Sequence, residues 1–112
     1  MVKIEAFLRP AALEQVQKAL AGIGIAGLSV LEVRGYGRQR GHREVYRGAE
    51  YTVDFVPKIK IEVAVSDEVK QQAIDAIIKA AKTGQVGDGK VFVVPVNEAV
   101  RVRTGETGDS AL

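Results

Sequence analysis

The chain has 112 residues, of which 46% are hydrophobic and 27% charged, which suits one globular domain with a modest core and excludes a disordered chain. The sequence contains no cysteine and a single histidine, His42, which excludes disulfides and thiolate metal sites and disfavours histidine-based catalysis. The net charge of +2 is too small to indicate a nucleic-acid-binding protein. No apolar run reaches the roughly 18 residues of a membrane span and the start is no signal peptide, so we expect a cytoplasmic protein.

The first half of the chain predicts a strand, a helix and a second strand. Apolar residues alternate with others over residues 2–8, the period of two expected of a strand. Pro10 suits the first turn of a helix, and apolar residues then recur at helical spacing until Gly22 and Gly24 end it. Residues 28–33 are apolar on both sides apart from Ser29 and Glu32, so we expect a strand that is covered on each face.

The second half repeats this order after a long connection. Residues 58–65 alternate cleanly and predict a strand, and residues 66–68, Ser-Asp-Glu, supply a cap and an acidic first turn for a helix that follows. Residues 83–90 predict a turn. Residues 91–96 predict a strand that Pro95 places at an edge or an end.

The order β-α-β, long loop, β-α-β predicts a single α+β domain over residues 1–112 with the ferredoxin-like split βαβ fold. Its sheet would have four antiparallel strands, with both helices on one face. The other face would carry Phe7, Ala64 and either Leu28 or Leu31, which is too apolar to leave in water. We therefore expect self-association through this face into a closed homo-oligomer.

The connection from Arg34 to Phe55 shows no sustained strand or helical period and exceeds the usual length of a loop. It holds five of the eight arginines in the chain, and two of its three tyrosines, Tyr46 and Tyr51, lie near its far end. These residues predict a loop that contacts a partner. The alternative is a solvated insertion, because long surface loops cost little closure entropy.

The turn before the last strand resembles the start of a phosphate-binding Walker A motif, but the match fails. Val91 stands where the motif needs Ser or Thr, and the segment runs from a helix into a strand. The segment Gly87-Asp88-Gly89-Lys90 nevertheless combines flexible glycines, consecutive N–H groups and a lysine, which favours anion binding. An ordinary tight turn is the alternative.

Arg101 and Arg103 would share one face of a short strand, where two guanidinium groups favour an anion between them. A charged edge strand explains them equally well. Lys58, Lys60 and Glu62 also share a face and leave the same two interpretations open. The sequence contains no catalytic triad, paired carboxylates or metal-ligand cluster, so we expect no enzyme.

Five long stretches match the motifs of one family in the right order: Glu32 to Gln39, Tyr46 to Tyr51, Ala80 to Gly84, Gly87 to Val93 and Arg101 to Glu106. On these residues the chain resembles the PII signal-transduction proteins of nitrogen control over essentially its whole length. The resemblance implies a compact homotrimer that binds ATP or ADP in the clefts between subunits, and 2-oxoglutarate together with Mg-ATP. It implies a sensor of nitrogen, carbon and energy status rather than an enzyme.

The resemblance also divides the chain into functional segments. Residues 37–55 would be the T-loop, which docks onto target proteins such as an ammonium transporter or a nitrogen-assimilation enzyme, so that any membrane contact is indirect. Residues 82–90 would be the phosphate-binding B-loop, and residues 101–112 the C-terminal loop and tail. Nucleic acid is not an expected partner.

The site residues follow by motif. The nucleotide would contact Gly27, Leu28, Ser29, Gly35, Arg38, Glu62, Ala64, Thr83, Gly87, Asp88, Gly89, Lys90, Arg101 and Arg103. The two C-terminal arginines would reach its phosphates from the neighbouring subunit. 2-Oxoglutarate would contact Gln39, Arg40, Gly41, Lys58 and Gly87, and Gln39 would help to hold Mg²⁺. Tyr51 resembles the tyrosine that is uridylylated or adenylylated in other members, whereas Ala49 replaces the serine that some members phosphorylate.

Two other interpretations stay open. One is a PII-like paralogue that senses another small molecule with an adenine nucleotide, although Gln39 and Lys58 fit the standard ligand set. The other is a nucleic-acid-binding ferredoxin-like domain that uses the arginine-rich loop. That domain would need exposed aromatic residues on its sheet for stacking, and the sequence does not supply them.

Overall fold

The computed structural model describes residues 1–36, 43–46, 49–52 and 55–112, with the side chains of 1–36 and 55–112. The elements in chain order are β1 (Val2–Leu8), the 3₁₀ turn η1 (Pro10–Ala12), α1 (Leu13–Gly22), β2 (Ser29–Gly35), β3 (Arg43–Tyr46), β4 (Ala49–Thr52), β5 (Val56–Val65), α2 (Lys70–Ala81), β6 (Gly89–Pro95) and the 3₁₀ turn η2 (Gly108–Ala111).

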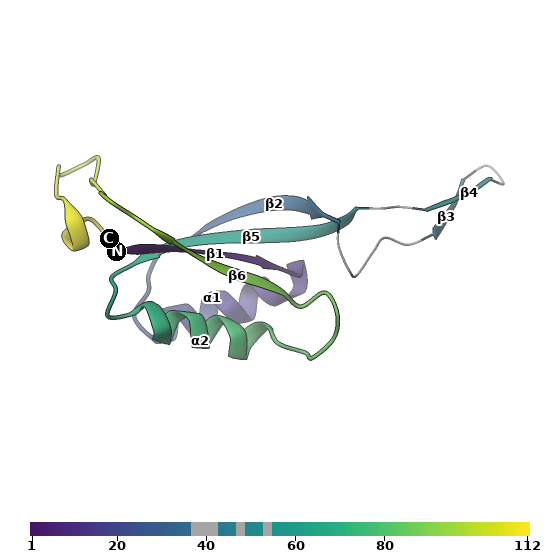
Figure 1. Cartoon of the computed structure of the whole chain (residues 1–112), viewed down its shortest axis with the longest axis horizontal. Helices are drawn as coiled ribbons and strands as arrows, with labels where there is room; N and C mark the ends of the chain where they lie inside the picture. The colour runs from purple at the N-terminus through teal and green to yellow at the C-terminus, as the bar shows by residue number, and fades with distance from the viewer. Residues whose placement is uncertain (37–42, 47–48, 53–54) are drawn as a thin grey trace.

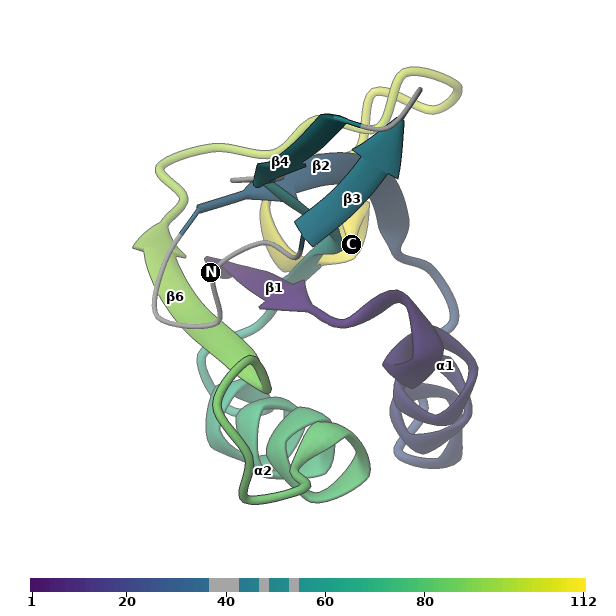
Figure 2. The ribbon, with the colours of Figure 1, turned by 90° about the vertical axis from the view of Figure 1, so that its right-hand side faces the viewer.

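Four of the strands form one antiparallel sheet in the order β2-β5-β1-β6 (Figure 1). Both helices cover the same face of this sheet, as the view along the strands shows (Figure 2). The predicted α+β, ferredoxin-like fold is therefore confirmed. The short strands β3 and β4 pair with each other inside the long connection. The sequence did not predict them, because four residues are too few to show a sustained period.

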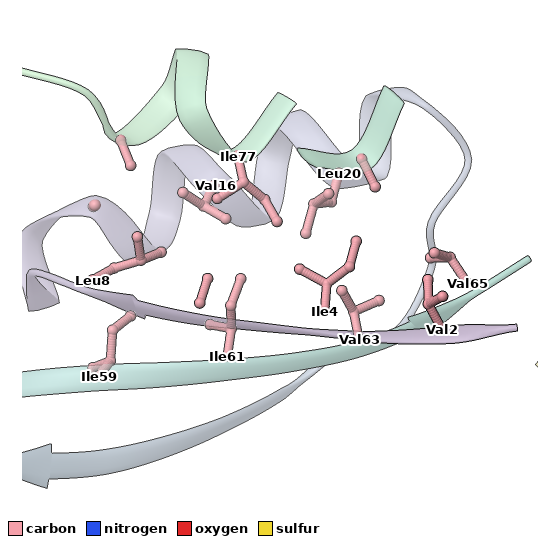
Figure 3. Close-up of a cluster of buried hydrophobic side chains, with 14 residues drawn as sticks. Val2, Ile4, Leu8, Val16, Leu20, Ile59, Ile61, Val63, Val65 and Ile77 are labelled. Carbon is pink, nitrogen blue, oxygen red and sulfur yellow. The ribbon is translucent and has the colours of Figure 1, made fainter. Parts of the chain in front are cut away.

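The core lies between the helices and the two central strands (Figure 3). Alternate residues of β1 and β5 point into it, and the register sets Ile4 opposite Val63 and Ala6 opposite Ile61. Val16 of α1 and Ile77 of α2 complete it from above. Each fully buried aliphatic side chain of this size contributes roughly 1.5–3 kcal/mol to folding. The period of two over residues 2–8 and 58–65 predicted these faces correctly.

The start of α2 differs from the prediction. The helix begins at Lys70, and no side chain caps it. Instead, the N–H of Val69 donates to the carbonyl of Ser66 at 3.1 Å, and the Asp67 carboxylate accepts a hydrogen bond from the N-terminal ammonium of Met1 at 3.1 Å. The predicted cap is therefore wrong, because its acidic residue is engaged by the neighbouring end of the chain.

The strand β2 is not covered on both faces in the single chain. It lies at one edge of the sheet and pairs only with β5. Val30 and Leu31 are 44% and 42% exposed, so the prediction of a doubly buried strand is wrong for the isolated chain.

The face of the sheet opposite the helices combines aromatic residues with a cluster of four charges. Phe7 and Phe92 contact edge to face, with ring centroids 6.0 Å apart. Beside them lie Lys3, Glu5, Lys60 and Glu62, whose ion pairs measure 3.1–3.8 Å. Leu31 belongs to this face, whereas Leu28 packs against the core. Self-association through this face stays a prediction.

Candidate ligand-binding site

A cavity of about 770 Å³ lies where β2, β5 and the B-loop meet, at the end of the sheet next to the long connection. Its lining residues are Phe7, Val33, Arg34, Gly35, Tyr36, Val56, Lys58, Gln85, Val86, Gly87, Asp88, Gly89 and Lys90. The apolar members form a surface suited to a flat or aliphatic ligand, and the cations Arg34, Lys58 and Lys90 favour a negative one.

Asp88 holds the B-loop in shape. Its carboxylate accepts hydrogen bonds from the N–H groups of Thr83 and Gly84, both at 2.8 Å, and from the Thr83 hydroxyl. It also forms an ion pair of 3.1 Å with Arg9. The Thr83 hydroxyl, the two N–H donors and the Arg9 charge together lower the pKa of Asp88 to about 2. Asp88 is therefore ionised at neutral pH and is used within the loop, so its side chain has little capacity left for a ligand.

Gly89 brings the end of the B-loop into direct contact with β1. Its φ is +115°, and a Cβ at this position would lie 1.8 Å from the carbonyl oxygen of Phe7. Gly84 and Gly87 also have positive φ, at 87° and 103°. Only glycine adopts these conformations readily, so the loop depends on its sequence at these positions.

Lys58 of β5 lines the cavity, and its side chain contacts the B-loop. Its Nζ donates to the Gly87 carbonyl at 2.8 Å. Burial, followed by the nearby charge of Arg9, lowers the pKa of Lys58. A Cβ at Gly35 would lie in ordinary van der Waals contact with Lys58 Cγ, at 3.5 Å. The exposed Lys90 adds a second ammonium at the same mouth.

The structure brings together one group of the predicted nucleotide residues: Gly35, Gly87, Asp88, Gly89 and Lys90 line the cavity, and Thr83 supports the loop. It does not bring the other described members of this predicted set there. Ser29 pairs with Glu62 and Ala64 with Lys3, further along the sheet, while Gly27 and Leu28 precede β2. Arg101 and Arg103 belong to the C-terminal segment, which follows the opposite end of β6 (Figure 1).

The register of β1 with β6 gives the separation between these two groups. Leu8 lies opposite Gly89 at the B-loop end, and Val2 lies opposite Pro95 at the other. At about 3.3 Å per residue, Gly89 at the end of the B-loop and Pro95 at the start of the C-terminal segment lie roughly 20 Å apart along β6. The predicted contacts therefore form two half-sites at opposite ends of one chain.

The C-terminal arginines do not share a strand face. Val100 forms an isolated bridge with Thr107, and the chain between them turns back, with the N–H of Gly105 donating to the Arg101 carbonyl at 2.8 Å. The alternation over residues 100–103 predicted a strand wrongly, because Val102 finds nothing to pack against and is fully exposed.

The guanidinium of Arg101 is engaged by the tail of its own chain. It donates to the Glu106 carboxylate at 3.0 Å and to the Leu112 carbonyl at 3.2 Å. Arg103 is exposed, and within the described part of the chain it makes no hydrogen bond or ion pair.

Several predicted residues lie outside the described part of the chain, namely Arg38, Gln39, Arg40 and Gly41. Tyr51 lies in β4, where its backbone pairs with that of Glu44. The roles assigned to these five residues therefore stay predictions.

Sequence reasoning missed Arg9 and Glu106, and it also missed the apolar lining of the cavity. Arg9 follows the first strand with no motif around it, and only the pairing of Leu8 with Gly89 would have indicated its place beside the B-loop. Glu106 closes a matched motif, but its partner became visible only with the turn at 102–104. In the described ranges, no helix is both long and apolar enough to cross a membrane.

The fold and the cavity define a ferredoxin-like domain with a cleft that contains several cations beside a glycine-rich loop. The family profile described as "Nitrogen regulatory protein P-II" matches residues 1–106. Proteins named nitrogen regulatory protein P-II are 56% identical in Azospirillum brasilense, 55% in Haemophilus influenzae and 54% in Cereibacter sphaeroides, each over the full length of both chains.

The crystal structure of Arabidopsis thaliana PII bound to citrate superposes with a TM-score of 0.82 at 41% identity, covering 99% of this chain and 91% of that one. The chain belongs to the nitrogen regulatory protein P-II family, whose members are regulatory signal proteins.

Proposed function

We propose that this protein is a trimeric sensor that binds ATP or ADP in clefts between its copies and 2-oxoglutarate together with Mg-ATP, and that it signals through the T-loop. One observation carries this proposal: the residues matched to nucleotide contacts form two half-sites roughly 20 Å apart on one chain. A nucleotide that contacts both half-sites needs two copies of the chain.

The first half-site suits the phosphates and the dicarboxylate. Lys58 and Lys90 supply ammonium groups, and the glycines allow the B-loop backbone to approach an anion closely. Within the described ranges, no three acidic or histidine side chains cluster in a way that could hold a metal ion. By the resemblance, Gln39 would help to hold Mg²⁺ together with oxygens of the ligands, and the ion would supply positive charge that offsets theirs.

The second half-site would come from the neighbouring copy. It consists of the segment 27–29, Glu62, Ala64 and the arginines of the C-terminal loop, with Arg103 exposed and Arg101 at the surface. Two different edges of the sheet, β2 and β6, are unpaired in the described part of the chain. A head-to-tail contact between unlike surfaces closes into a ring when its rotation permits, which supports a cyclic trimer.

A carboxylate ligand is supported by the Arabidopsis relative, which was solved with citrate, a polycarboxylate. In this chain Lys58 is the candidate partner for a carboxylate of 2-oxoglutarate, with Gln39, Arg40 and Gly41 completing the site by motif. The change Gln39→Glu would add a negative charge at the junction with magnesium and should weaken 2-oxoglutarate binding more than ADP binding. Equal weakening of both ligands would refute that role of Gln39.

The output would be a population shift of the T-loop, in which metabolites select between loop conformations and target proteins read them. An ammonium transporter or a nitrogen-assimilation enzyme is the expected class of target, and Tyr51 is a candidate site for nucleotidylation. The protein would act by binding and not by catalysis, in the cytoplasm.

Subunit complementation tests the split site most directly. Lys90→Gln and Arg103→Gln should each weaken ATP binding, because each removes a cation from a different half-site. If the two variants are unfolded together and refolded as mixed trimers, about a quarter of the clefts should combine two intact half-sites. High-affinity sites should therefore reappear in the mixture and be absent from each variant alone. No recovery in verified mixed trimers would show that one chain supplies both residues.

Calorimetry tests the ligand set. 2-Oxoglutarate should bind in the presence of Mg-ATP and not with ADP. No 2-oxoglutarate binding in either state, with ATP still bound, would favour a paralogue that senses another metabolite.

A further inference from the structure

Arg9 lies at the end of β1, directly below the B-loop, and makes one ion pair with it. Its terminal nitrogen lies 3.1 Å from Oδ1 of Asp88, and its side chain is 32% exposed. The Nε atom of the same guanidinium is buried and has no hydrogen-bond partner in the described part of the chain. A buried donor without a partner is unfavourable, and the ion pair with Asp88 is the described polar contact that offsets this cost.

The Asp88 carboxylate links two kinds of contact. Three of its donors, the hydroxyl and N–H of Thr83 and the N–H of Gly84, belong to the loop itself and close it into a ring. Arg9 reaches the same carboxylate from a central strand of the sheet. Among the described contacts of this carboxylate, the Arg9 ion pair alone connects the ring to the rest of the fold.

We infer that Arg9 is a positioning residue of the B-loop, which it holds in its ligand-binding shape through the Asp88 carboxylate rather than by touching the ligand. The consequence for nucleotide affinity rests on the proposed function, whereas the consequence for the loop does not. Arg9 fixes the ring of residues 83–88 against the end of β1, next to the close contact of Gly89 with Phe7. The loop N–H groups and Lys90 are thereby presented to the cavity without rearrangement on binding.

The guanidinium has a second effect, which a suitable variant separates from the first. Its positive charge lies close enough to Lys58 to contribute to the lowered pKa of that group. Arg9→Lys retains the charge but loses the planar fork of donors, while Arg9→Gln loses both. If geometry matters most, the two variants should behave alike. If charge contributes as well, Arg9→Lys should retain part of the affinity.

The first measurement needs no nucleotide. Amide exchange by NMR on the ligand-free protein should show that Arg9→Gln raises the exchange rates of the Thr83 and Gly84 N–H groups several-fold, because their acceptor is no longer fixed. Glu14→Gln is the matched control, since it removes the exposed Glu14–Lys18 ion pair of 3.0 Å and should leave both rates unchanged. Unchanged rates in folded Arg9→Gln would overturn the inference, whether or not the protein binds nucleotide.

The second measurement is a double-mutant cycle on ATP affinity. Arg9→Gln should weaken ATP binding about tenfold, and in the Asp88→Asn background the same change should cost less than about twofold, since the path through Asp88 is already broken. An equal loss in both backgrounds would mean that Arg9 acts on the ligand directly, and the inference would be wrong. Absence of ATP binding by the unmodified protein would refute the proposed function instead, and the exchange rates would still decide the role of Arg9.

Discussion

Gly89 is the position where a single methyl group should disturb both the fold and the site. A Cβ there would lie 1.8 Å from the Phe7 carbonyl oxygen and 2.9 Å from its carbon, whereas ordinary contacts begin at 3.4 Å. The distance to the oxygen is therefore about 1.6 Å shorter than an ordinary contact. Because both neighbours are backbone atoms, no side-chain rotation can relieve the clash. Either β1 or the start of β6 has to move.

The strand β1 cannot move easily, since it is hydrogen-bonded to β5 on one side and to β6 on the other. The start of β6 should therefore detach, which breaks the pairing of Leu8 with Gly89 and of Phe7 with Lys90. The positive φ adds strain of about 1–2 kcal/mol for any residue with a Cβ. Overpacking typically adds about 1–3 kcal/mol more, so we expect Gly89→Ala to cost about 2–5 kcal/mol.

Gly84→Ala is the matched control for this prediction. Its φ is +87°, but a Cβ would meet nothing within 4 Å, so this variant should show only the backbone strain of about 1–2 kcal/mol. Urea unfolding followed by circular dichroism measures both values, and it must be done at equal protomer concentration because the proposed assembly would contribute to stability. Equal losses for the two variants would refute the argument that the Phe7 carbonyl limits this position.

Three further changes test other parts of the structure. The pKa of Asp88 is lowered from 3.8 to about 2, so the contribution of its carboxylate to the free energy of unfolding is complete above pH 3.8 and is lost as the pH falls towards 2. Asp88→Asn should therefore reduce the loss of stability between pH 3.8 and 2, as followed by circular dichroism. Ile77→Ala should cost about 2–5 kcal/mol in urea unfolding, whereas the half-exposed Ile78→Ala should cost less than about 1.5 kcal/mol, and equal costs would contradict the assigned core. Glu106→Gln should raise ATP affinity about two- to fivefold by calorimetry, because Arg101 loses a competing carboxylate, and a fall would mean that Glu106 orients Arg101 instead.

The central part of the fold could be predicted because its signals are local. Residues 2–8 and 58–65 alternate in the sequence, and the same alternation appears as buried and exposed faces in β1 and β5, which have neighbours on both sides. The B-loop could also be predicted from the sequence, since glycines and an aspartate in a short segment indicate a turn wherever the segment lies. These predictions depended on neighbours in the sequence alone.

The wrong predictions concern residues whose surroundings are set by distant parts of the chain. Ser66-Asp67-Glu68 has the composition of a helix cap, yet Asp67 pairs with the N-terminal ammonium. Residues 100–103 alternate like a strand, but no partner strand lies beside them, and the chain turns. Arg9 carried no signal at all, because its partner Asp88 lies near the other end of the sequence.

The geometry of the cavity also explains how a bound ligand could influence the long connection. Gly35 at the end of β2 pairs with Val56 at the start of β5, so the two stems of the T-loop meet beside the cavity. Tyr36 and Val56 both line it, and the Tyr36 ring lies 6.0 Å from that of Phe55. A ligand in the cavity would therefore contact both ends of the segment that we propose a target binds. Because such coupling is reciprocal, a target that selects one T-loop conformation must change ligand affinity by the same factor by which the ligand changes affinity for the target.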